Sequence, residues 1–357
     1  MKIDFYHIKL PLNPPLMLMG RLHSIRSGLL IRLADQGRIG YGEANPLPGL
    51  HKETIEEVLQ QLTALLKRVP GWTIPLSLNE IDTLLKDVEQ DKPLLPSLRF
   101  ALESALLQLA ASHYNTLPPN ILNPSAASEI EINGLLAGEG GKEAAVLQQM
   151  LKAGCKTIKV KVGRHEIDEE IALVKKLSSL LPVNAQLRLD ANQAWEMAEA
   201  RRFMDGVGEC AVEYLEEPLK NPADLHLFTD ITPVPLALDE SMVSASPKDF
   251  DVPANVAAFI LKPAVLGGAV TVSQWADLAH ANDADVVISG SFCSSVGLIA
   301  EAGIAAAFSR SAVGLGTWRW LAEDVLNDRF APKEYHISAK DAFAKLHSIS
   351  GRHFSAQ

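Results

Sequence analysis

Five short polar motifs recur through the middle of this chain of 357 residues, and each closes an apolar run. Successive motifs are separated by 29, 26, 23 and 23 residues, measured between their key residues Lys161, Asp190, Glu216, Asp239 and Lys262. A strand, a helix and their connections occupy about 30 residues, so the spacing predicts that each motif ends one strand of a β/α barrel. Because such barrels carry their catalytic groups at the carboxyl ends of the strands, we expect three acids and two lysines to meet at one mouth.

The composition argues against several other classes of protein. A formal net charge of −10 argues against nucleic acid or an anionic membrane as the main partner, and no apolar run is long enough to span a bilayer. The first ten residues alternate as in a strand and lack the apolar core of a signal peptide. The cysteines Cys155, Cys210 and Cys293 lie far apart and form no disulfide or zinc pattern. We therefore expect a cytoplasmic protein that acts on a small molecule.

Two domains and a tail are predicted from the order of the strand and helix patterns. Residues 1–115 begin with strands and continue with helices, which is typical of an α+β domain. Residues 116–320 alternate between strands and helices, as a single (β/α) barrel requires. Residues 321–357 have a mixed pattern, and we expect this tail to pack on the first domain.

Alternating apolar residues predict the strands, and amphipathic runs predict the helices. In the first domain these patterns give strands at 2–10, 28–35 and 38–44, a loop at 18–28, and helices from Thr54 to about Val69 and after Pro96. In the second domain they give strands at 129–136, 156–163, 185–192, 211–218, 234–240, 257–263, 285–292 and 311–317. They also give helices at 142–154, 166–181, 197–207, 270–282 and 296–309.

The lysines of the first motif share one face of their strand. Successive side chains of a strand alternate between its two faces, so Lys159 and Lys161 lie opposite Ile158 and Val160. The apolar face suits the layer of helices, which leaves both lysines pointing into the barrel. Crowding by a second cation lowers the pKa of a lysine and makes its amine a usable base. A pair of surface lysines on an edge strand is the alternative, although a closed barrel has no edge strand.

The same alternation of side chains can be followed for the acids of the next three motifs. By alternation Asp190, Glu216 and Asp239 point toward the barrel mouth, whereas Glu240 falls on the opposite side. Three carboxylates that converge from adjacent strands repel one another without a cation. Hard oxygen ligands at a partly open site suit Mg2+, which keeps positions for water and substrate. Taken singly, each acid would also fit a helix N-cap or a surface salt bridge.

Lys262 completes the predicted site from the opposite wall. It ends the sixth of the eight predicted strands and Lys161 ends the second, so the two lysines face each other across the barrel. Two lysines that flank a substrate, with a metal between them, suit the removal of a proton next to a carboxylate. One lysine would be the base, and the metal would neutralise the enediolate that forms.

The set K-x-K, D-x-N, E-E-P, D-E-S and K-P is similar to that of the enolase superfamily, in its muconate-lactonizing branch. Within that branch the chain resembles most the o-succinylbenzoate synthases of menaquinone biosynthesis. The segments that carry this resemblance are GYGEANPLPGLHKET, PSLRFALESALLQL, KVKVG, LRLDANQAW, LEEP, DES, ILKP and VVISGSFCSSVGL. They run from the first domain to the predicted seventh strand of the barrel, so the resemblance covers nearly the whole chain.

That resemblance implies a fold, a cofactor and roles for individual residues. The fold would be a modified (β/α)7β barrel of the TIM type, with the α+β domain capping its mouth. Asp190, Glu216 and Asp239 would bind Mg2+, for which Mn2+ can substitute. Lys161 would be the general base that also returns a proton to the departing hydroxyl. Lys262 would stabilise the enediolate through its charge.

The resemblance also implies how the substrate is held. Lys159 would lie close to a carboxylate oxygen of the substrate. Ser289, Ser291 and the backbone of Gly314 would surround the succinyl carboxylate.

The implied reaction is a Mg2+-dependent syn-dehydration of 2-succinyl-6-hydroxy-2,4-cyclohexadiene-1-carboxylate to 2-succinylbenzoate. The protein would then be a carbon–oxygen lyase, with the loops 18–28 and 46–50 closing over the substrate to exclude water. An N-acylamino acid racemase, or a mixed synthase and racemase, is the alternative, because two opposed lysines can move a proton across either face. A barrel that only binds a small carboxylate would have little reason to keep five polar groups at one mouth. The sequence leaves the oligomeric state open.

The chain departs from the family that it resembles at two places, the last predicted strand and Cys293. The last predicted strand runs into GLGTWRW, where dipeptide epimerases of the same branch carry D-x-D for the amino group of the substrate. We therefore expect no epimerisation of dipeptides. Cys293 replaces a polar residue, and we interpret it as a packing thiol and not as a nucleophile.

Overall fold

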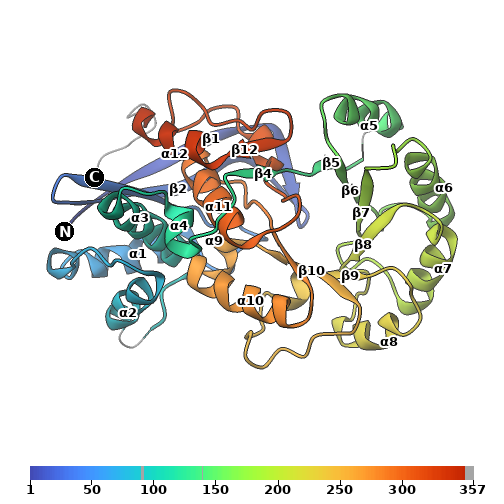
Figure 1. Cartoon of the computed structure of the whole chain (residues 1–357), viewed down its shortest axis with the longest axis horizontal. Coiled ribbons are helices and arrows are strands. Elements are labelled where there is room, and N and C mark those ends of the chain that lie inside the picture. The colour runs from blue at the N-terminus through green and yellow to red at the C-terminus, as the bar shows by residue number, and fades with distance from the viewer. Residues whose placement is uncertain (90–91, 139, 350–357) are drawn as a thin grey trace.

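The computed structural model describes residues 1–89, 92–138 and 140–349. An antiparallel sheet with its helices forms one part of the molecule, and a curved parallel sheet with its own helices forms the other (Figure 1). The α+β pattern and the alternating β/α pattern predicted from the sequence are therefore both present.

The N-terminal sheet contains β1 (Lys2–Leu18), β2 (Arg21–Asp35) and β3 (Arg38–Ala44) in chain order. The predicted loop at 18–28 is wrong, because β1 and β2 continue as one hairpin in which Leu18 lies opposite Arg21. Met19 and Gly20 form its two-residue turn with φ of 47° and 71°, and two positive φ angles match the twist of a hairpin. The sequence carries no Asn-Gly or Asp-Gly pair at this turn, so the hairpin has no strong local signal.

Helices α1 (Ile55–Leu65), α2 (Leu78–Glu89), α3 (Pro96–Tyr114) and α4 (Pro118–Leu122) follow the sheet. Thr54 caps α1 by accepting a hydrogen bond from the backbone of Glu57, which confirms the predicted start of this helix. The helix ends before residue 69, where the short 3₁₀ helix η1 (Val69–Gly71) begins. Helix α3 lies directly against β3, because a Cβ on Gly42 would come within 1.8 Å of the carbonyl oxygen of Ala101.

The parallel sheet has the strand order β11-β10-β9-β8-β7-β6-β5, so spatial neighbours follow one another in the chain. Its strands are β5 (Gly134–Leu136), β6 (Thr157–Lys161), β7 (Gln186–Asp190), β8 (Val212–Glu216), β9 (Leu236–Leu238), β10 (Val256–Leu261) and β11 (Asp285–Ile288). The predicted eighth strand is reduced to two parallel bridges, Val313 with Ile132 and Gly314 with Ser289. These bridges connect the first and last strands, so the predicted barrel is confirmed.

Helices alternate with these strands on the outside of the sheet, and α5 to α8 follow its outer rim in Figure 1. The predicted helices are present as α5 (Glu143–Lys152), α6 (Ile167–Ser178), α7 (Met197–Val207), α10 (Ala269–Ala281) and α11 (Ser295–Phe308). Short helices that were not predicted are η2 (Pro222–Asp224), α8 (Leu225–Thr229), η3 (Glu240–Met242) and α9 (Pro263–Leu266). Among the described residues, no helix combines the length and the apolar character that a membrane span requires.

An apolar layer fills the barrel beneath its mouth. Its buried side chains form one cluster, made of Tyr214, Ala237, Ala258, Ile260 and Val287. Tyr214, Ala237 and Ile260 each stand two positions before a motif residue, so on a strand they lie one step deeper on the same face. The polar residues of the motifs therefore lie above a layer of buried side chains, which also includes Arg188, whose guanidinium lies 4.9 Å from the centre of the Tyr214 ring.

The tail contacts both parts of the molecule. Leu321 bridges to Leu12 of β1, and β12 (His336–Ser338) pairs with β4 (Glu129–Glu131). The predicted strand at 129–136 is consequently two strands, β4 beside the tail and β5 in the barrel. Before the tail, the chain forms η4 (Gly316–Trp320). The described tail also contains α12 (Ala339–Ala344) and η5 (Lys345–Ser348), while residues 350–357 lie outside the described residues. The domain boundaries after residues 115 and 320 stay predictions.

Candidate active site

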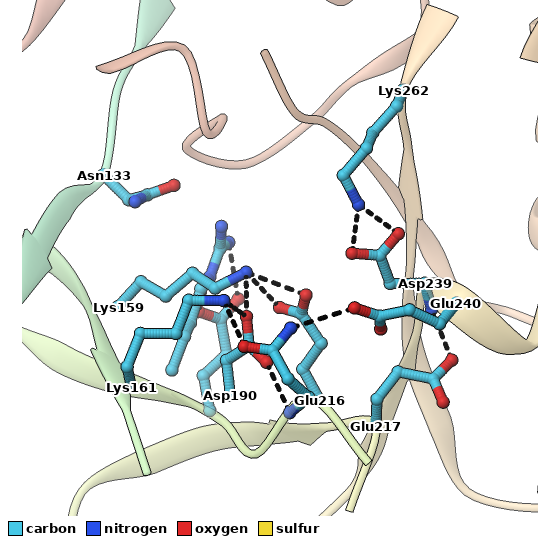
Figure 2. Close-up of polar contacts among 12 residues, drawn as sticks. Asn133, Lys159, Lys161, Asp190, Glu216, Glu217, Asp239, Glu240 and Lys262 are labelled. Atoms are coloured by element: carbon cyan, nitrogen blue, oxygen red, sulfur yellow. Dashed lines mark hydrogen bonds and ion pairs between the residues drawn. The ribbon is translucent and has the colours of Figure 1, made fainter. Parts of the chain in front are cut away.

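The two lysines of β6 point into the barrel mouth, as the alternation of the strand predicts (Figure 2). Lys159 Nζ lies 2.8 and 2.6 Å from the two carboxylate oxygens of Glu216, and 2.7 Å from Oδ2 of Asp190. Lys161 Nζ lies 2.6 Å from the same Oδ2 and 2.6 Å from Oδ1 of Asn192. Both ammonium groups are thus held by acceptors at the ends of the next two strands.

The acids around the lysines govern their ionisation. Burial alone would lower the pKa of Lys159, but the carboxylates of Asp190 and Glu216 raise it well above its ordinary value. Burial also opposes the charge of Lys262, yet Asp239 raises its pKa. The predicted lowering of a lysine pKa by a neighbouring cation is therefore wrong for Lys159, because carboxylates dominate the field at its amine.

The three predicted metal ligands stand at the ends of neighbouring strands. Asp190 and Glu216 are register partners at the ends of β7 and β8, and Asp239 directly follows β9. Their side chains are 1, 0 and 6% exposed. Burial opposes the ionisation of Asp190, yet Lys159 and Lys161 hold its pKa well below its ordinary value. Burial and the charge of Asp190 raise the pKa of Glu216 well above its ordinary value, so the lysines do not fully offset the negative charge there.

Lys262 reaches the site from the opposite wall (Figure 2). It directly follows β10, four strands away from β6, and its Nζ donates hydrogen bonds to both carboxylate oxygens of Asp239. The structure therefore brings the three predicted lysines and three predicted acids to one mouth, with Lys159 and Lys161 on one side and Lys262 on the other.

The carboxylates suit a hard divalent cation, although each is bound to a lysine in this structure. Among the described residues, no three acidic, histidine or cysteine side chains surround a point closely enough to hold a metal ion. Lys159 bridges Asp190 and Glu216, so a cation at these oxygens would displace its ammonium group. Buried oxygen ligands on adjacent strands, together with the raised pKa of Glu216, give the donor set and the excess charge that Mg2+ favours. The residues fit Mg2+, and their assignment as its ligands stays a prediction.

The sequence analysis missed two acids and an asparagine that lie at this mouth. Glu240 was placed on the far side of its strand, which is wrong: its Oε1 accepts a hydrogen bond of 2.9 Å from Asn192 (Figure 2). The chain leaves the strand at Asp239 and enters η3, so the alternation ends there. Burial and then Asp239 raise the pKa of Glu240 to about 7. Asn133 and Glu217 also lie here in Figure 2, and the doubled acids of E-E-P and D-E-S were the available signal for Glu217 and Glu240.

The predicted substrate contacts are brought together only in part. Ser289 and Gly314 meet where the barrel closes, and a Cβ on Gly314 would lie 3.2 Å from Oγ of Ser289. The hydroxyl of Ser291 instead donates a hydrogen bond of 2.7 Å to Glu301 of α11, and Ser291 is fully buried. Burial also raises the pKa of the Cys293 thiol well above its ordinary value, which fits the predicted packing thiol.

A buried polar seam, defined here by Arg26, Glu43, Ser294 and Glu301, joins the N-terminal sheet to the barrel. Arg26 of β2 donates to the carbonyl oxygens of Asn45 and Pro46, at 2.6 and 3.4 Å, and of Phe292, at 3.1 Å. Glu43 of β3 accepts hydrogen bonds of 3.0 and 3.1 Å from the backbone N–H groups of Ser294 and Gly297, at the start of α11. The seam therefore fixes the loop at 46–50 against the end of the seventh strand.

The predicted capping loops lie next to each other. A Cβ on Gly49 would lie 3.3 Å from Cβ of Met19, at the tip of the β1–β2 hairpin. Beyond Gly49, Lys52 donates a hydrogen bond of 2.9 Å to Ser244, in the segment that follows β9. The apolar side chains of the hairpin tip remain exposed, with Met19 at 78% and Leu22 at 65%. The hairpin tip thus adjoins a loop that the seam ties to the barrel.

Two family models and a set of curated proteins match this chain. Residues 1–109 match the N-terminal domain of MenC, and residues 142–343 match the enolase C-terminal domain-like family. The o-succinylbenzoate synthase of Klebsiella pneumoniae (strain 342) is 34% identical over 304 residues, which cover 84% of this chain and 85% of that protein. The protein PHYLLO, chloroplastic, of Arabidopsis thaliana is 31% identical over 84% of this chain, which corresponds to 20% of that longer protein.

Solved structures share the fold. The L-Ala-D/L-Glu epimerase from Bacillus subtilis superposes with a TM-score of 0.79 at 24% identity, over 95% of this chain and 96% of that chain. The muconate lactonizing enzyme from Pseudomonas fluorescens superposes with a TM-score of 0.76 at 22% identity, over 100% of this chain and 96% of that chain.

Proposed function

This chain belongs to the o-succinylbenzoate synthase family of the enolase superfamily, and from that premise we propose its reaction in detail. The reaction is the Mg2+-dependent syn-dehydration of 2-succinyl-6-hydroxy-2,4-cyclohexadiene-1-carboxylate to 2-succinylbenzoate, in menaquinone biosynthesis. Membership of the family makes the protein a carbon–oxygen lyase. The substrate, the syn stereochemistry and the need for Mg2+ are proposals.

The first step removes the proton from C1 of the ring, next to the carboxylate. Lys161 accepts this proton at Nζ, and the electron pair of the broken C–H bond moves onto the carboxylate to give an enediolate. The side chain of Lys161 is 19% exposed, so its amine is accessible from the mouth. Asp190 and Asn192 hold this amine in place through hydrogen bonds of 2.6 Å each.

The second step expels the hydroxyl group from C6. The ammonium of Lys161 gives its proton to this oxygen, the C–O bond breaks, water leaves and the ring becomes aromatic. One lysine serves both steps only if hydrogen and hydroxyl leave from the same face of the ring, which is the reason for the syn stereochemistry.

Positive charge around the substrate carboxylate stabilises the enediolate. Lys262 supplies it from the opposite wall, and Lys159 supplies it beside Lys161. When bound by Asp190, Glu216 and Asp239, Mg2+ would supply further positive charge next to this carboxylate.

The observation that carries the proposal is the position of Lys161 and Lys262 on opposite walls of one mouth, above three buried carboxylates. The test is incubation of the purified protein with the cyclohexadiene substrate, followed by detection of the aromatic product. We expect product to form, to stop forming with a chelator and to return with added Mg2+. If no aromatic product forms, the proposed substrate is wrong. If turnover is complete in the presence of the chelator, the proposed metal requirement is wrong.

An N-acylamino acid racemase is the second candidate, because a lysine on each wall can serve each enantiomer as base or acid. The epimerases among the structural neighbours are compatible with such chemistry on this fold. The test is exchange of the α-hydrogen of an N-acylamino acid in deuterated water, starting from each enantiomer. Deuterium in the product from both enantiomers is expected of a racemase, and no exchange from either would exclude this activity.

A further inference from the structure

We propose that Glu217, the second acid of the E-E-P motif, is a positioning residue that sets the relative positions of the carboxylates of Asp190, Glu216 and Asp239. Glu217 itself is fully buried. The role rests on the proposed function, because it concerns the carboxylates that would bind Mg2+ there.

The side chain of Glu217 links the ends of three neighbouring strands. Its Oε1 accepts hydrogen bonds from the backbone of Asp239 at 2.7 Å, and from the backbone and hydroxyl of Ser241 at 2.9 and 2.5 Å. Its Oε2 accepts a hydrogen bond of 2.9 Å from Nε2 of Gln193, three residues beyond Asp190. One carboxylate at the end of β8 therefore holds the segments that follow β7 and β9.

The backbone at this junction needs such support. Asn192, Gln193 and Glu217 have φ of 45°, 60° and 41°, a left-handed region that is unfavourable for residues with a Cβ. The backbone N–H of Gln193 also donates to the carbonyl oxygen of Glu217 at 2.7 Å, so the strained segments hold each other. Without the carboxylate of Glu217, these segments lose the bonds that keep Asp190 and Asp239 at a fixed separation.

The hydrogen bonds to Glu217 come from backbone, hydroxyl and amide donors of the two neighbouring segments. These bonds fix the geometry of the mouth. Glu217→Gln keeps the size of the side chain and exchanges one acceptor oxygen for a donor, so it disturbs the bonds without leaving a cavity.

The test measures Mg2+ affinity by calorimetry on the full-length protein, together with the thermal unfolding midpoint in the absence of Mg2+. Groups that orient metal ligands change affinity by roughly 10- to 100-fold. We expect Mg2+ binding to weaken about 100-fold in Glu217→Ala and about tenfold in Glu217→Gln. The double variant Glu217→Gln/Gln193→Glu restores a matched donor and acceptor, and we expect it to recover affinity relative to Glu217→Gln.

A smaller substitution and a matched control are needed in case Glu217→Ala does not fold. Ser241→Ala removes one donor to Glu217 and should weaken Mg2+ binding, whereas Ser246→Ala, in the same segment but exposed, should not. Unchanged Mg2+ affinity in folded Glu217→Ala, or in Ser241→Ala if Glu217→Ala does not fold, would overturn the positioning role. Absence of Mg2+ binding to the wild-type protein would instead overturn the proposed metal site, and the role of Glu217 with it.

Discussion

The barrel mouth and the polar seam both bury charged groups, but they satisfy them differently. At the mouth, Lys159 and Lys161 pair with carboxylates and their side chains remain 14 and 19% exposed. At the seam, Arg26 is 2% exposed and its guanidinium donates to three backbone carbonyl oxygens. Charges that stay accessible can exchange a protein partner for a ligand, whereas charges enclosed by backbone groups hold two parts of the molecule together. The exposure of the charged side chains therefore distinguishes the mouth, where we propose that the reaction takes place, from the seam, which holds the two parts of the molecule together.

The pKa values of buried acids also differ between the mouth and the seam, because the acids have different partners there. At the mouth, lysine charges hold the pKa of Asp190 low against the effect of burial. At the seam, burial dominates and raises the pKa of Glu301 to about 8, because hydrogen bonds from Ser291 only partly compensate. At the mouth, Asp190 therefore stays ionised at neutral pH because two lysines contact it, whereas Glu301 at the seam, which contacts no cation among the described residues, is largely neutral.

The largest expected effect is the loss of dehydration rate when Lys161, the proposed general base, is replaced. Loss of a general base costs about 10²–10⁴-fold in rate, and Lys161→Ala should exceed this range because, in the proposed mechanism, the same amine also assists departure of the hydroxyl. Lys161→Arg should recover almost nothing, since arginine does not deprotonate in proteins. Lys262→Ala should also be severe, but Lys262→Arg keeps the positive charge and should recover part of the rate. Single-turnover rates test this comparison, and substantial dehydratase activity in Lys161→Arg would move the base to another residue.

The metal site comes next. Glu216→Gln removes a proposed Mg2+ ligand from the mouth, so Mg2+ binding and turnover should both be lost, while the unfolding midpoint without Mg2+ should hold. Calorimetry and the dehydration assay give the two readouts. Full activity in a Glu216→Gln protein that binds no metal would show that the acids of the mouth serve another purpose.

At the seam, the expected effect is on stability and its pH dependence. Glu301 has a folded pKa of about 8, raised from 4.5, so the unfolded state holds fewer protons between these values and stability falls as pH rises from about 4.5 to about 8. Glu301→Gln cannot ionise, so it should flatten this fall by an amount on the order of a few kcal/mol. Urea unfolding at pH 5, 7 and 8.5 measures the slope. An unaltered slope would mean that Glu301 is ionised in the folded protein.

The smallest expected effect compares two arginines of the same strand. Arg26→Met leaves buried carbonyl groups without donors and should lower the free energy of unfolding by about 2 kcal/mol. Arg32 forms an ion pair of 2.8 Å with Asp4, and both side chains are 26% exposed. Arg32→Met should therefore cost less than about 1 kcal/mol. Equal losses in chemical denaturation would contradict the distinction between enclosed and accessible charge.

Local patterns reveal the mouth much better than the seam. The spacing and alternation that predict Lys161, Asp190, Glu216, Asp239 and Lys262 are properties of single strands, and parallel strands bring their ends together automatically. The seam has no such periodicity, because Arg26 and Phe292 are 266 positions apart in the chain. Its contacts exist only once the N-terminal sheet is docked on the barrel.

The wrong predictions for Glu240 and Ser291 have physical causes that cannot be read from a sequence pattern. Alternation holds only while the backbone stays extended, so it misplaced Glu240, where the chain turns into η3. It could not separate the serines of the seventh strand end, because Ser291 turns toward Glu301 of α11, while Ser289 lies beside Gly314.

By itself, the sequence determined the barrel, its cap and the lysines and acids that end the strands at the mouth, because strand periodicity is a local property. Only the tertiary structure decided the charge of each group there. The pKa of Lys159 depends on Asp190 and Glu216, which reach it from two other strands. A pKa follows from distances to all surrounding charges and from burial, and neither quantity exists until distant segments have packed together.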